Sequence, residues 1–160
     1  MRSIFLAVML LAGSFASATE CPMHQDHQNA GLVARGNKAM GFDQEKTTHH
    51  FLLQNDGGII QVEAKDPQDP ESRNAIRGHL SHIAVLFSKG EFDIPMFIHD
   101  RMPAGVPVMK ELKDAITYKY EDMDRGGKVI LASQNEDAVK AIHDFLRFQI
   151  EDHKTGDPLK

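Results

Sequence analysis

Residues 48–64 read THHFLLQNDGGIIQVEA, and this stretch decides the fold class. Over residues 48–54 the side chains alternate between two faces, with Phe51 and Leu53 on the same face as His49, which is typical of a β-strand. The NDGG sequence that follows tolerates the positive φ angles of a tight turn, and residues 59–64 alternate again. These residues therefore predict a β-hairpin.

A second hairpin is predicted at residues 116–133. Residues 116–121 alternate, the DRGG sequence at residues 124–127 forms the turn, and residues 128–133 form the returning strand. Each hairpin is followed by a helical pattern. The first helix begins after the capping residue Asp69 with Pro70, and the second spans residues 136–152 after a capping box of Ser133 and Glu136. Their buried stripes consist of Ile76, Leu80, Ile83, Ala84 and Phe87 in the first helix, and of Val139, Ile142, Phe145, Leu146 and Gln149 in the second.

The resulting element order is ββα-ββα, which predicts an α+β fold with a four-stranded antiparallel sheet and helices packed on one face. Between the two halves, residues 91–105 are predicted to form a long connection. A short helix is expected to follow from Pro107 and to bury Val108, Met109 and Leu112. We assign residues 47–160 to this single α+β domain.

Composition limits the classes of function. With 160 residues, of which 41% are hydrophobic and 26% charged, the chain fits one globular domain. Its net charge is −5 and no basic stripe interrupts the mixed charges, so no nucleic acid partner is expected. Histidine stands out, because the chain has nine histidines but only one cysteine and no tryptophan.

The N-terminus carries the pattern of an export signal. Arg2 precedes an apolar run over residues 4–12, and the small residues Ala16, Ser17 and Ala18 form a cleavage site, so residues 1–18 are predicted to be a signal peptide. We therefore expect the protein to be periplasmic or secreted. The apolar run is shorter than the roughly 20 residues that a transmembrane helix needs, and no later stretch approaches that length. No membrane span is predicted.

Residues 19–46 are predicted to form a flexible N-terminal arm, because they show no sustained period and glycines interrupt their apolar residues. Near its start, the sequence CPMHQDH places a thiolate, a thioether and two imidazoles within seven residues. Soft or borderline ions such as copper and zinc prefer these donors. The candidate metal ligands of the arm are Cys21, Met23, His24 and His27. A polar tail without a metal site is the alternative.

A second group of candidate ligands lies in the domain. His79 and His82 are neighbours at the edge of the buried face of the first helix, where both could reach one metal ion. His99 lies in the predicted connection, with Asp100 as a hydrogen-bond acceptor for its ring. His49 is expected to face the helices. The alternative is that these histidines are ordinary residues of the core boundary or of the surface.

Three hypotheses about function follow. The first is an exported metal-binding protein, acting as a carrier, buffer or sensor of copper or zinc through His, Met and Cys donors. The second is a non-metal module that binds a protein partner or forms a homodimer, because Leu52 and Ile59 are apolar residues on the open face of the sheet. A histidine-dependent enzyme is the least favoured, because the sequence contains no recognisable activated nucleophile or carboxylate pair.

Overall fold

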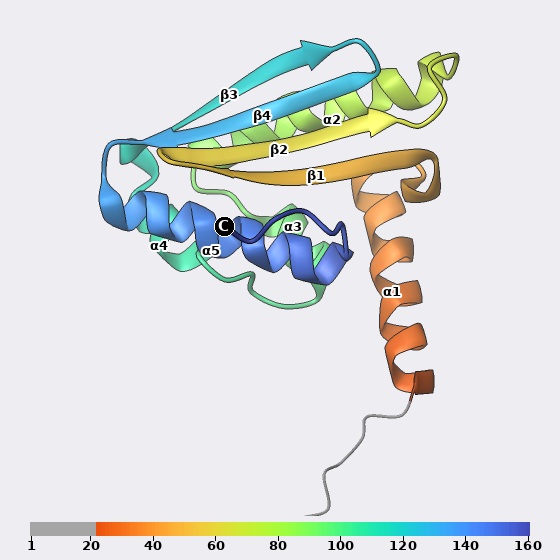
Figure 1. The fold of residues 1–160 in the computed structure, drawn as a ribbon, viewed down its shortest axis with the longest axis horizontal. Coiled ribbons are helices and arrows are strands. Elements are labelled where there is room, and N and C mark those ends of the chain that lie inside the picture. Colours follow the sequence, from red (N-terminus) through yellow and green to blue (C-terminus); the bar gives the residue numbers. More distant parts are fainter. Residues whose placement is uncertain (1–21) are drawn as a thin grey trace, which may run out of the picture.

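The computed structural model describes the backbone of residues 22–160 and the side chains from residue 30 onward (Figure 1). Strands β1 (Thr47–Gln54) and β2 (Gly57–Ala64) form the first antiparallel hairpin, and β3 (Ile116–Met123) and β4 (Gly126–Ser133) form the second. β2 also pairs with β4, so the strand order in the sheet is β1-β2-β4-β3. The predicted α+β class, the ββα-ββα order and the four-stranded antiparallel sheet are confirmed.

The turn glycine of the first hairpin is required by close packing. Gly57 has a φ angle of 147°, and a Cβ atom there would lie 2.1 Å from the carbonyl oxygen of Leu131 on β4. Only a residue without a side chain fits at this point, where β2 begins its pairing with β4.

Helices α2 (Pro70–Ser88) and α5 (Glu136–His153) follow the two hairpins, as predicted. The Asp69 side chain caps α2 by accepting a hydrogen bond from the Ser72 backbone N–H at 2.9 Å. The predicted capping box at the start of α5 is wrong. Asn135 caps this helix through the Ala138 N–H, whereas the Ser133 hydroxyl donates to the Ala115 carbonyl on the neighbouring strand connection.

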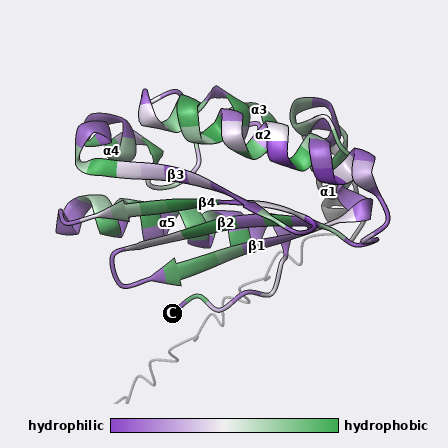
Figure 2. Ribbon diagram, turned by 90° about the horizontal axis from the view of Figure 1, so that it is seen from above, coloured by the Kyte–Doolittle hydropathy of each residue, from purple (hydrophilic) through white to green (hydrophobic). Residues whose placement is uncertain are grey.

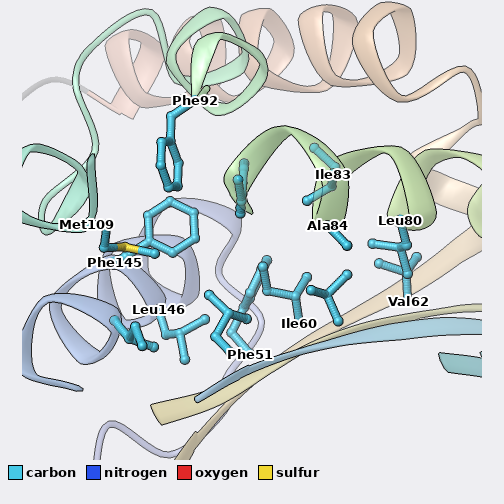
Figure 3. Packing of buried hydrophobic residues seen from close by; sticks show 14 of the residues in the cluster. Phe51, Ile60, Val62, Leu80, Ile83, Ala84, Phe92, Met109, Phe145 and Leu146 are labelled. Atoms are coloured by element: carbon cyan, nitrogen blue, oxygen red, sulfur yellow. The ribbon is translucent and has the colours of Figure 1, made fainter. Parts of the chain in front are cut away.

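The hydrophobic core lies between one face of the sheet and these two helices. α2 contacts β2, β3 and β4, while α5 contacts β1, β2 and β4. Hydrophobic residues are concentrated along β1, β2 and β4 (Figure 2), and Figure 3 shows Phe145 of α5 close to Phe92 and Met109. The predicted stripe of α2 is fully buried, and in α5 only Val139 departs from the prediction, because Ala138 takes the buried position.

Most of residues 22–46, which belong to the segment predicted to be a flexible arm, are helical. Helix α1 spans Pro22–Met40, and the short 3-10 helix η1 (Gln44–Lys46) leads into β1. Leu32 and Met40 are buried, and the Arg35 Nε donates to the Ile98 carbonyl at 2.8 Å. Gly36 does not break the helix; it is buried where a Cβ atom would lie 1.9 Å from the Gln44 side chain. This glycine permits packing rather than marking an irregular segment.

The predicted connection at residues 91–105 contains helix α3 (Asp93–His99). It is followed by α4 (Val106–Glu111) and by the 3-10 helix η2 (Lys113–Ala115). The expected short helix is present: it buries Met109 as predicted, together with Val106, and Leu112 at its end is half-buried, but Val108 is exposed and that part of the prediction is wrong. Gly105, with φ of 79°, lies so close to the Ala141 carbonyl that a Cβ atom would be 2.0 Å away, so α4 begins in close contact with α5.

No helix in the described part of the chain combines the length and the apolar character needed to cross a membrane. The predicted signal peptide at residues 1–18 lies outside the described residues.

Candidate functional site

A small cavity of about 60 Å³ lies between the sheet and helices α1, α2, α3 and α5. This volume holds a few water molecules or a metal ion. Most of the lining is apolar, but five polar side chains reach it from three helices and one strand. The lining residues are Met40, His49, Phe51, Ile60, His79, Ile83, Phe87, Ile94, Pro95, Ile98, His99, Phe145, Gln149 and His153.

Four of the nine histidines of the chain line this cavity. His49 reaches it from the helix-covered face of β1, and His79 comes from α2. His99 is the last residue of α3, and His153 is the last residue of α5. Elements far apart in the sequence therefore bring these imidazoles together.

The rings of these histidines and of Phe42 lie next to one another in the site. The ring centroids of His49 and His153 are 5.7 Å apart with nearly parallel planes, and those of His153 and His99 are 5.1 Å apart with perpendicular planes. The Phe42 ring lies 6.1 Å from His49 and 5.7 Å from His79. His49 thus occupies the middle of this group of rings.

The sequence predicted part of this site. The structure places His49, His79 and His99 at one cavity, but it does not bring His82 there, because the His82 side chain is exposed to solvent. Cys21 lies outside the described residues, as do the side chains of the three other candidate ligands in the arm. Those three are Met23, His24 and His27.

Three lining residues with donor atoms were not predicted as site residues: Gln149, which was predicted only as part of the buried stripe of α5, His153 and Met40. His153 lies four residues after Gln149, so it continues the inner stripe of α5 and could have been found from this spacing. Met40 was missed because its segment was predicted to be irregular. It is the last residue of α1, and it is buried.

His99 is held on both ring nitrogens. Its Nδ1 lies 2.5 Å from an Asp152 carboxylate oxygen, and its Nε2 lies 2.9 Å from the Gln149 side-chain oxygen. Arg101 donates to the other Asp152 oxygen at 2.6 Å. The acceptor proposed from the sequence, Asp100, is instead exposed and ends α3 in a left-handed conformation. His99 is therefore a fixed part of the wall, with no free nitrogen.

The other three histidines are neutral at neutral pH. Burial, and then the neighbouring His153 and His79, lower the pKa of His49 to about 3. Burial, assisted by His82, lowers the pKa of His79 to about 4. Burial and then His99 lower the pKa of His153 to about 4, against the opposing effect of the Asp152 carboxylate. Each neutral ring keeps one nitrogen lone pair for a hydrogen bond or a metal ion.

Polar atoms at this site lack partners. Among the described residues, nothing hydrogen-bonds to the buried Nε2 of His49 or to the buried Nε2 of Gln149. An unsatisfied buried polar group costs about 1–3 kcal/mol. A ligand that engages His49 would recover part of this cost.

The site is not a preformed three-ligand metal centre. In the part of the chain that the structure describes, no three His, Cys, Asp or Glu side chains converge closely enough to hold a metal ion. The histidines share a cavity, but their nitrogens do not meet at one point.

Comparison of the chain with protein-family models, with curated proteins and with solved structures finds no match.

Proposed function

We propose that this protein is an exported carrier or buffer that holds a transition-metal ion, copper or zinc, in the histidine-lined cavity. The observation that carries the proposal is the buried Nε2 of His49, which has no partner among the described residues and lies in a cavity shared with the neutral imidazoles of His79 and His153. Neutral imidazole is a common ligand of both metals. Export is proposed from the signal pattern of residues 1–18.

The spacing of the rings is compatible with a shared ion. With metal–nitrogen bonds of about 2.0 Å and tetrahedral angles, two imidazoles on one ion have ring centroids about 5 Å apart. The centroids of His49 and His153 are 5.7 Å apart. The separation of these two rings is therefore close to that of two imidazoles on one ion.

Binding is favoured over catalysis because of the lining. Among the described residues, the cavity is lined by no carboxylate, serine or cysteine, which are the groups that would act as nucleophile or as a carboxylate acid–base pair. The wall histidine His99 has both ring nitrogens engaged. These features fit storage or transfer of an ion.

The proposal is tested by titrating metal-free protein with Cu(I), Cu(II) and Zn(II) in competition with a chromophoric chelator. We expect His49→Gln and His79→Gln to weaken binding by at least about 100-fold, because a lost ligand costs more than the 10–100-fold loss seen when an outer-shell partner is removed. His82→Gln is the matched control, since this exposed histidine lies on the same helix as His79, and binding should be unchanged.

A further variant distinguishes metal binding in the cavity from metal binding by the N-terminal segment. Replacing Cys21, Met23, His24 and His27 by Ser, Leu, Gln and Gln removes the donors of that segment and leaves the cavity intact. Binding that survives in this variant and is lost in His49→Gln supports the cavity. Unchanged affinity in both cavity variants, or no binding tighter than that of a poly-His peptide, contradicts the proposal.

A protein partner on the open face of the sheet is the second candidate. Leu52, Ile59 and Ile130 occupy adjacent register positions on three neighbouring strands, on the face opposite the core. Each of them is half-buried. This apolar row favours a contact surface for a protein partner or a second copy of the chain.

A further inference from the structure

The donors of the cavity are all uncharged. They are the imidazoles of His49, His79 and His153, the Met40 thioether and the Gln149 amide. No carboxylate or thiolate is among the described residues that line the cavity. An ion bound there keeps its full charge inside a largely apolar wall.

This lack of negative charge discriminates between ions. The cost of moving an ion from water into a medium of low dielectric constant rises with the square of its charge, so a divalent ion costs about four times as much as a monovalent ion of similar size. Asp152, the acid behind the wall histidine His99, is already paired with Arg101. It leaves little negative charge to compensate a second positive charge.

The number of available ligands also discriminates between ions. A structural zinc site takes four ligands, whereas the described residues contain no three convergent His, Cys, Asp or Glu side chains. Cu(I) is satisfied by two or three soft donors, and a thioether is one of the donors that selects it. Met40, at the end of α1, supplies that thioether beside the histidines.

We infer that the cavity selects a monovalent soft ion, Cu(I), over Zn(II), with His49 and Met40 at the centre of the ligand set. This inference rests on the proposed function and assigns its metal. It also gives α1 a role, because the helix that packs across α3 carries the sulfur ligand to the histidines of β1 and α2.

The test compares Cu(I) with Zn(II), and uses Ag(I) as a monovalent soft probe that does not oxidise. The protein carries the substitutions Cys21→Ser, Met23→Leu, His24→Gln and His27→Gln, so that the N-terminal donors do not contribute. We expect Cu(I) and Ag(I) to bind at least about 100-fold more tightly than Zn(II) at pH 7.5.

Met40→Leu is the decisive variant. Leucine has nearly the volume of methionine, so the core should accept it, and circular dichroism checks the fold. We expect Met40→Leu to weaken Ag(I) and Cu(I) binding by at least about 10-fold and to leave Zn(II) binding unchanged. Met109→Leu is the matched control, because Met109 is fully buried but does not line the cavity.

The outcomes separate the two proposals. Zinc binding that is tighter than Cu(I) binding, and that is lost in His49→Gln, would overturn the selectivity and leave the metal-binding function standing. Equal effects of Met40→Leu and Met109→Leu would overturn the assignment of Met40. Failure of all three ions to bind would overturn the function and the inference together.

Discussion

Acidification from pH 7.5 to pH 5 is expected to lower the free energy of unfolding of the metal-free protein by on the order of 3–6 kcal/mol. The cause is the set of three half-buried histidines, His49, His79 and His153, whose folded-state pKa values lie at about 3, 4 and 4. Once unfolded, each ring regains a pKa near its ordinary value of 6.5. The unfolded chain therefore binds more protons throughout this window.

The direction of the change in stability with pH follows from that difference in proton binding. Because the folded pKa values are lowered, the contribution of these rings to stability is complete above pH 6.5 and declines as the pH falls below it. Each ring contributes up to about 1.4 kcal/mol per pH unit.

The charged groups around the three rings also favour the neutral form of the imidazoles. His49 faces His50, His79, His153 and Lys65, all of which disfavour its charge. His79 faces His82, and His153 faces His99. Asp152 alone favours the charged form, at His153, and the effect of burial exceeds it.

Urea denaturation at pH 7.5, 6.5, 5.5 and 5.0 measures the effect. His79→Gln should remove about one third of the slope, whereas His82→Gln on the same helix should keep it. The carboxylates with lowered pKa values, such as Asp69 and Asp157, act below this window, because their ordinary pKa is 3.8. Stability that does not change between pH 7.5 and pH 5 would show that these rings do not stay neutral in the folded protein.

Truncation of Phe145 to alanine is expected to lower the free energy of unfolding by about 3–5 kcal/mol. The Phe145 side chain is 1% exposed, and its ring packs edge-on against Phe87 at 5.9 Å and Phe92 at 6.2 Å. It also lines the histidine cavity, so its loss enlarges a space that is already present. The expected loss is a large fraction of the free energy of unfolding of an ordinary domain, which is about 5–15 kcal/mol.

Phe97→Ala is the matched control, because Phe97 is 48% exposed on α3. Surface substitutions of this kind usually change stability by no more than about 0.5 kcal/mol. Chemical denaturation of both variants at pH 7.5 makes the comparison. Similar losses in the two variants would contradict the position of Phe145 in the core.

The parts of the fold that were predictable are those with a local signal. Alternation and Gly-Gly turns predicted both hairpins, and the spacing of Ile76, Leu80 and Ile83 predicted the buried face of α2. Helix α1 was not predictable in this way, because Gly36 reads locally as a break. A glycine is needed at position 36 because the Gln44 side chain packs against it, and the local sequence does not reveal this contact.

The same distinction applies to the site. Strand alternation placed His49 on the covered face, and helical spacing placed His79 at the edge of the core. The partner of His99 could not be predicted, because Asp152 reaches it from α5 through packing between distant segments. His153 was predictable from its spacing to Gln149, but it lies at the C-terminus of a helix, where a histidine often serves only to interact favourably with the helix dipole.

The most direct test of the metal site in the cavity is a crystal structure of the Cu(I)-loaded protein, with anomalous data collected at the copper absorption edge. We expect one strong anomalous peak inside the histidine-lined cavity, about 2.0 Å from a His49 ring nitrogen and about 2.3 Å from the Met40 sulfur. A peak confined to residues 21–27, or no peak in a protein that has taken up copper, would contradict it.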